Sequence, residues 1–276
     1  MRSFSSSFLL FFYQIALGGL LGLSVTPFHE LDRAFYKSTG GVLFVIALLG
    51  LWGKSSFYWQ SITTETSIVT LTEILFHCLF VLFFALYMIS LWGENQKFRA
   101  RAFAACVLSG LAGLIVSTHS FYPAPFWSLE TLVYPVAFFL SALLLGTVTV
   151  GMLIGHWYLI DTGQSLEPFI RLYKFFLIAL IVQTIFMLTS SIALYLFGAS
   201  ESVAQLERLW TNHSTLLLTR VIAGQIAPLV LSWMIWRTLL IPHTMAATGL
   251  FYIALLGVFV GEILGKQILA LTYVPF

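Results

Sequence analysis

The chain has 276 residues, of which 59% are hydrophobic and only 9% are charged, and its formal net charge is +2. A typical soluble domain has roughly 25% charged residues, so this composition excludes an ordinary soluble enzyme and indicates an integral membrane protein. No polar segment approaches the length of a domain, and we expect residues 1–276 to form one integral-membrane helical domain. The small net charge gives no indication of a nucleic-acid partner.

Apolar stretches of about 20 residues, the length that crosses a bilayer as a helix, recur along the chain. They predict an all-α fold, a bundle of about eight transmembrane helices. The predicted spans are residues 5–26, 39–56, 67–92, 99–118, 130–160, 170–198, 214–237 and 246–270. No small-residue cleavage site follows the first span, so we expect a retained helix and not a signal peptide.

The distribution of Lys and Arg predicts the orientation of the bundle. One set of loops and helix ends contains eight basic residues: Arg33, Lys37, Lys97, Arg99, Arg101, Arg171, Lys174 and Arg237. The opposite set contains Arg2, Lys54 and Arg208. Because cytoplasmic loops are enriched in basic residues, we expect both termini on the outer side of the membrane.

Polar and ionisable residues recur in the outer half of several predicted spans. A charged residue costs roughly 2.5–3.5 kcal/mol at the centre of an isolated membrane helix, so its position there suggests a functional site. The residues concerned, from five helices, are Tyr13, Gln14, Glu73, His77, His119, Arg220, Glu262 and Lys266. Since their depths are similar, we expect them to share one polar interior, with Glu73 near Arg220.

A purely structural role is an alternative interpretation of these residues. Glu262 and Lys266 are four residues apart, as are Glu73 and His77, and such pairs can interact along one helix. Arg220 can also join two helices by pairing with Glu262. The last span has glycines at four-residue steps, which is typical of close helix packing: Gly249, Gly257, Gly261 and Gly265.

A polar pocket near one membrane face suits a quinone, whose head group exchanges protons and whose isoprenoid tail stays in the bilayer. His and Glu exchange such protons when their pKa values lie near neutrality. A secondary transporter is an alternative, although its site typically lies near the midplane. Haem b is a further alternative, with His77 and either His119 or His213 as paired ligands. No zinc spacing or nucleotide motif is present, and we predict no metal site.

Two stretches resemble the membrane subunits of dimethyl-sulfoxide-reductase and polysulfide-reductase type complexes, the DmsC/NrfD group. The segment GEILGK, residues 261–266, resembles a GExLG motif followed by a basic residue, which is usually Arg in that family. The segment TRVIAGQIAPLVLSW, residues 219–233, is similar to the family's penultimate helix, with Arg220 and Gly224 in matching positions. The predicted topology also matches that family.

The resemblance implies a haem-free anchor in a bacterial inner (cytoplasmic) membrane, not an enzyme by itself, that reacts with ubiquinone or menaquinone near the outer face. Electrons would pass between the quinone and an iron–sulfur subunit docked outside. That subunit would connect to a catalytic subunit of molybdenum, hydrogenase or multihaem type. We therefore expect Glu73 and His77 to be the catalytic proton acceptors. The expected quinone-binding residues are Tyr13, Gln14, His119, Arg220, Glu262 and Lys266.

Overall fold

The computed structural model describes residues 4–28, 30–64, 67–121, 127–161, 163–241 and 243–276, and their secondary structure is entirely helical. The elements are α1 (Phe4–Ser24), α2 (Arg33–Thr64), α3 (Ile68–Ser90), α4 (Gln96–Thr118), α5 (Glu130–Ile160), α6 (Glu167–Phe197), α7 (Ser200–Asn212), α8 (Ser214–Val221), the π-helical turn η1 (Ile222–Ile226), α9 (Ala227–Leu239) and α10 (Thr244–Thr272). Eight helices of these described residues are long and apolar enough to cross a membrane, with α8, η1 and α9 forming one span. The predicted all-α bundle is confirmed, and the chain is a multi-pass membrane protein.

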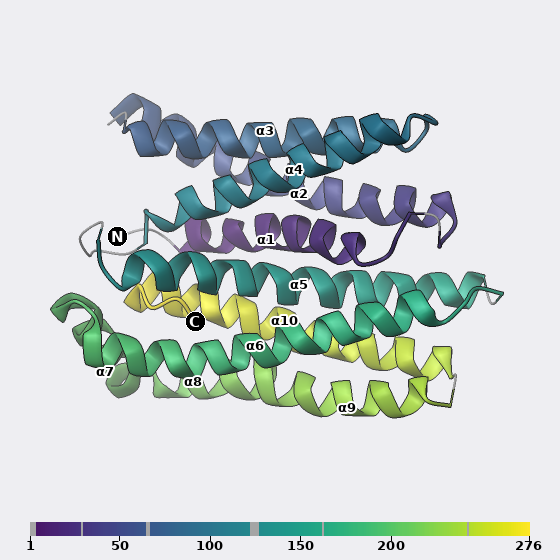
Figure 1. Ribbon diagram of the computed structural model, residues 1–276. Helices are drawn as coiled ribbons and strands as arrows, with labels where there is room; N and C mark the ends of the chain where they lie inside the picture. The colour runs from purple at the N-terminus through teal and green to yellow at the C-terminus, as the bar shows by residue number, and fades with distance from the viewer. Residues whose placement is uncertain (1–3, 29, 65–66, 122–126, 162, 242) are drawn as a thin grey trace.

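The helices form two groups, α1 to α4 and α5 to α10, and α1 joins the groups by packing along α5 (Figure 1). Helix α1 begins and α10 ends at the same end of the bundle, which we call the terminal end. The opposite end, which we call the basic end, carries the eight basic residues from Arg33 to Arg237 that predict the cytoplasmic side. Arg2, counted for the other side, lies outside the described residues. The orientation of the termini in the membrane stays a prediction.

Glycines allow the backbones to touch at two helix crossings. A Cβ atom on Gly146 of α5 would collide with the backbone of Gly18 and Gly19 on α1. A Cβ atom on Gly224 of η1 would lie 2.8 Å from the Cα atom of Gly261 on α10. Small residues permit this close approach between membrane helices.

The predicted packing edge of the last span is confirmed at three of its four glycines. Gly257, Gly261 and Gly265 contact η1 or the end of the chain, whereas a Cβ on Gly249 would meet no described atom within 4 Å. After α10, Tyr273 adopts a left-handed conformation with φ of 60°. This residue turns the last residues back, so that Phe276 is buried and its carbonyl packs over Gly265.

The structure corrects the second predicted span. Helix α2 has 32 residues and continues to Thr64, whereas the apolar stretch predicts an end near residue 56. Lys54 therefore lies inside a helix and not in an outer loop, and it is only 7% exposed. The helix continues past this charge because Glu73 on α3 neutralises it. Helix α7 has no counterpart among the predicted spans, and the π-helical turn η1 lies inside the predicted span 214–237 without having been predicted as a turn.

Candidate functional site

The expected polar residues form two separate clusters and not one shared interior. The α2–α3 cluster consists of Tyr13, Lys54, Tyr58, Glu73, His77 and Ser117. The α8–α10 cluster consists of Ser141, Gln183, Arg220, Glu262 and Lys266. Within the described ranges, no hydrogen bond or ion pair joins the clusters, and α1 packs against α2 on one side and α5 on the other (Figure 1). The expectation that Glu73 lies near Arg220 is therefore wrong.

The α2–α3 cluster is centred on the buried carboxylate of Glu73. Lys54 Nζ donates to Glu73 Oε1 at 2.7 Å. Ser117 Oγ, from α4, donates to the same oxygen at 3.1 Å, and Tyr58 OH donates to it at 3.3 Å. Lys54 and Tyr58 are four residues apart on α2, so they share the face that meets Glu73 on α3. The ion pair offsets the cost of holding each charge in the membrane.

His77 extends this network by one helical turn. Its Nδ1 atom contacts the hydroxyl of Tyr58, and its Nε2 atom lies 3.3 Å from Ser117 Oγ. The Tyr13 ring packs on the imidazole with 4.2 Å between centroids, and its hydroxyl donates to the carbonyl of Gly110 at 2.8 Å. Tyrosine, histidine and glutamate in contact can exchange protons along the chain of hydrogen bonds. Because both imidazole nitrogens have polar partners, ligation of a haem iron by His77 would break one of these contacts.

The ring of Tyr58 also lines an open groove of about 380 Å³ on the outer surface of α2 and α3. The other lining residues are Leu48, Leu51, Trp52, Ser55, Trp59, Ile62 and Cys78. Trp52 and Trp59 are 76% and 72% exposed, although both belong to a helix that crosses the membrane. The groove therefore faces lipid, and Tyr58 both lines it and contacts Glu73 and His77.

Glu262 is the centre of the α8–α10 cluster. Arg220 Nη2 donates to Glu262 Oε1 at 2.7 Å, and Gln183 Nε2 donates to the same oxygen at 2.7 Å. Ser141 Oγ donates to Oε2, and Lys266 Nζ lies 3.9 Å from that oxygen. The side chains of Arg220 and Glu262 are each 1% exposed. Four elements (α5, α6, α8 and α10) are thus joined through one carboxylate.

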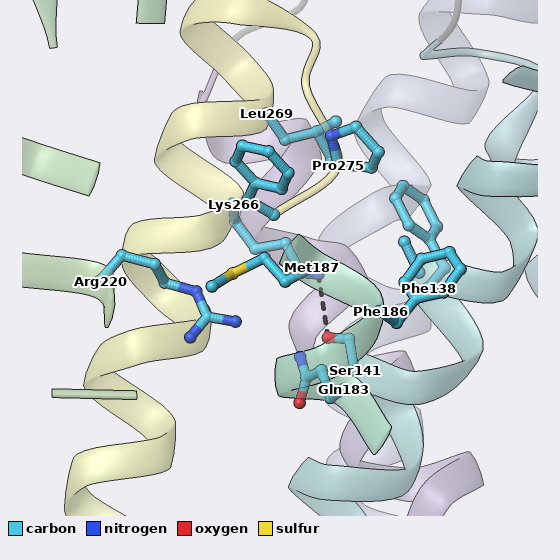
Figure 2. A pocket seen from close by; sticks show the side chains of 11 residues that line it. Phe138, Ser141, Gln183, Phe186, Met187, Arg220, Lys266, Leu269 and Pro275 are labelled. Carbon is cyan, nitrogen blue, oxygen red and sulfur yellow. Dashed lines mark hydrogen bonds between the residues drawn. The ribbon is translucent and has the colours of Figure 1, made fainter. Parts of the chain in front are cut away.

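Two cations and one carboxylate give the α8–α10 cluster a formal charge of +1. Figure 2 shows Arg220, Lys266, Ser141 and Gln183 around a small cavity, with the dashed bond from Lys266 to Ser141. The cavity is about 20 Å³, measured as the space open to the centre of a water molecule. This volume holds one or two waters. Arg220 Nε and Nη1 are buried without a partner among the described residues, so the cluster favours an oxygen acceptor.

The other expected head-group contacts lie near the clusters. Gln14 Nε2 donates to the carbonyl of Phe138 at 2.9 Å, which ties α1 to α5. His119 is half-buried at the C-terminal cap of α4, two residues beyond Ser117. Sequence reasoning did not identify five cluster residues: Lys54, Tyr58, Ser117, Ser141 and Gln183. Of these, Lys54 and Tyr58 have a sequence signal, since they are a helical turn apart.

Comparison of the chain with protein-family models, with curated proteins and with solved structures finds no match. The fold and the two clusters define the class of the protein: it is a membrane protein of eight helical spans that contains two buried ion pairs, Lys54–Glu73 and Arg220–Glu262. Residues from the stretches 219–233 and 261–266 meet at the crossing of η1 and α10: Arg220, Gly224, Gly261, Glu262 and Gly265.

Proposed function

We propose that the protein is a quinone- or quinol-interacting membrane subunit of a respiratory electron-transfer complex in a bacterial inner membrane. The observation that supports this most is the position of Tyr58. Its ring lines the lipid-facing groove and its hydroxyl contacts both Glu73 and His77. A quinone needs this combination, because its tail stays in lipid while its head group exchanges protons with buried polar groups.

In this proposal the tail lies in the groove against Trp52 and Trp59, and the head group lies at Tyr58. Oxidation of a quinol releases two protons and two electrons. The protons pass through the Tyr58 hydroxyl to His77 and Glu73, and then towards the terminal end. The electrons pass to an iron–sulfur subunit docked at that end, which is linked to a catalytic subunit of molybdenum, hydrogenase or multihaem type. Quinone reduction is the same sequence in reverse.

A head group in this groove does not contact Arg220, Glu262 or Lys266, because α1 lies between them. In the proposal these residues hold α5, α6, α8 and α10 together through Glu262. Tyr13 and Gln14 are neighbours on α1, and they contact the α2–α3 cluster and α5 respectively. Helix α1 therefore sets the position of one cluster relative to the other.

Tyr58→Phe is expected to lower quinol-dependent turnover by roughly 10²-fold, the usual contribution of a positioned proton-transfer group. The ring still lines the groove, so quinone binding is expected to change little. The measurement is quinol oxidation by the intact complex at saturating quinol. Tyr195→Phe is the matched control, since Tyr195 is 56% exposed on α6. Unchanged turnover in Tyr58→Phe, Glu73→Gln and His77→Ala alike would show that this cluster does not react with quinol.

Trp59→Ala is expected to weaken quinone binding about tenfold, or roughly 1.4 kcal/mol, because the tail loses an aromatic contact. The measurement is a binding isotherm for a short-chain quinone in lipid nanodiscs. Trp233→Ala is the control, because Trp233 is 64% exposed and lines a different hollow, on α6 and α9. Equal weakening in both variants would mean that the quinone partitions into lipid and does not occupy the groove.

The partners are tested by gentle detergent extraction from native membranes and mass spectrometry of the proteins that co-purify in stoichiometric amount. Iron–sulfur, molybdenum-type or multihaem partners are the expected result. A colourless, stable chain that purifies alone would contradict the proposal.

A secondary transporter is the second candidate, and the π-helical turn η1 favours it. This turn lies within the span and begins two residues after Arg220, and π-turns occur frequently at functional sites. Interrupted helices are also typical of transporter binding sites. The adjoining cluster has a positive charge and N–H groups of Arg220 without a partner in the described part of the chain, which suit a small anion. Anion flux into liposomes that contain the purified chain alone would support this candidate over the anchor.

A further inference from the structure

A pocket of about 360 Å³ opens at the basic end of the bundle, away from both clusters. It lies between the C-terminal end of α1, the segment that follows α1, and the first turns of α4. Its main lining residues are Thr26, Phe28, Tyr36, Tyr87, Arg99 and Phe103. The volume is that of a small-molecule site. The proposed quinone chemistry does not use this pocket.

Arg99 is the central polar residue of this pocket. Its side chain is held in place, since Nη2 donates to the carbonyl of Gly93 at 2.8 Å and Cζ lies 4.0 Å from the centroid of the Phe28 ring. The residue is only 7% exposed, and its Nε atom is buried without a partner among the described residues. A buried guanidinium with a free N–H favours an acceptor oxygen.

No carboxylate in the described part of the chain neutralises this arginine. The Cζ atom of Arg33 lies 6.0 Å from the centroid of the same Phe28 ring. Arg33 therefore adds a second positive charge near Arg99. Neither arginine forms an ion pair among the described residues. Glu30 is engaged by Arg171 at 2.9 and 3.2 Å, and Asp32 accepts the backbone N–H of Ala34. Arg99, which lines the pocket, is therefore available to an anion, and Arg33 adds positive charge near the Phe28 ring.

We infer that this pocket binds the phosphate head group of an anionic phospholipid from the leaflet at the basic end. A planar guanidinium held by stacking matches the oxygens of a phosphodiester. The pocket lies where the membrane helices end, and Ala100 and Phe103 continue its wall one turn further along α4 towards the hydrocarbon region. Basic pockets between membrane helices at the cytoplasmic side commonly bind lipid head groups. A soluble phosphate compound has the same recognition chemistry, so the experiment separates the two sources.

The test uses the full chain in nanodiscs of phosphatidylcholine with a minor fraction of phosphatidylglycerol. Native mass spectrometry after release counts the phosphatidylglycerol that stays bound. Arg99→Gln is expected to lower the retained anionic lipid about fivefold, the effect of one basic residue on an anionic head group. Arg101→Gln, an exposed residue on the same helix, removes the same charge and is expected to retain the lipid.

Arg99 also donates to the Gly93 carbonyl, so Arg99→Gln could lose lipid because the fold is weakened. A second variant therefore tests the pocket without removing this hydrogen bond. Ala100→Trp fills the mouth of the pocket without removing the arginine and is expected to lose the lipid as well, with an unchanged melting temperature. Equal losses in Arg99→Gln and Arg101→Gln would show general surface attraction and overturn the inference. Displacement of the lipid by millimolar inorganic phosphate would assign the pocket to a soluble ligand and also overturn it.

Discussion

Glu262→Gln is expected to destabilise the protein more than any other single exchange in the α8–α10 cluster. Glu262 accepts hydrogen bonds from Arg220, Gln183 and Ser141 and faces Lys266. The exchange removes the cluster's negative charge and leaves two buried cations within the membrane. Breaking a buried ion pair by removal of one partner costs about 3–5 kcal/mol.

The same reasoning predicts an order among three variants. Lys266→Gln leaves the Arg220–Glu262 pair at 2.7 Å and brings the formal charge to zero, so a small effect is expected. Arg220→Gln also leaves a neutral pair, but Lys266 is 3.9 Å from the carboxylate and makes a weaker contact, so an intermediate effect is expected. The melting temperature of each variant in one detergent measures the order.

Glu207→Gln is the control for this series, because Glu207 is exposed on α7. Substitutions of exposed residues usually change the free energy of unfolding by less than about 0.5 kcal/mol. If Glu262→Gln melts no lower than Lys266→Gln, the carboxylate does not balance both cations, and the cluster's charge has a different compensation.

The positions of the spans follow from hydrophobicity because each helix must place apolar side chains against lipid. The prediction failed at Lys54 for a specific reason. A charge ends an apolar stretch in the sequence, but the helix continues because Glu73, 19 positions away on the next helix, neutralises it. Helix α7 was missed since its 13 residues mix polar and apolar side chains and give no membrane signal.

Depth in the membrane could be derived from the sequence, but angular position around the bundle could not. Glu73 and Arg220 are both within about two turns of a span's beginning at the terminal end, as predicted. They nevertheless lie on opposite sides of α1, because equal depth does not determine which neighbour a residue faces. The alternative that Arg220 joins two helices by pairing with Glu262 is confirmed. Ser141 and Gln183 are neutral and have no periodic pattern, so nothing in the sequence marks them as partners of Glu262.

Gly146→Ala is expected to be a strongly damaging glycine substitution, because it acts on the backbone contact between α1 and α5. The new methyl group would overlap the backbone of Gly18 and Gly19, which cannot move aside as a flexible side chain can. Overpacking costs typically about 1–3 kcal/mol, and a backbone obstacle puts this site at the upper end. The two helix groups would have to separate at this crossing.

Gly249→Ala is the matched control, since a Cβ there meets no described atom within 4 Å. Replacing glycine by alanine inside a helix stabilises it by up to about 1 kcal/mol, so this variant is expected to melt at or above the wild-type temperature. Melting temperatures in detergent, together with quinol-dependent turnover, measure both effects. A displaced α1 also moves Tyr13 away from His77, so turnover should fall in Gly146→Ala and not in Gly249→Ala. A Gly146→Ala protein as stable as wild type would show that α1 and α5 do not meet backbone to backbone.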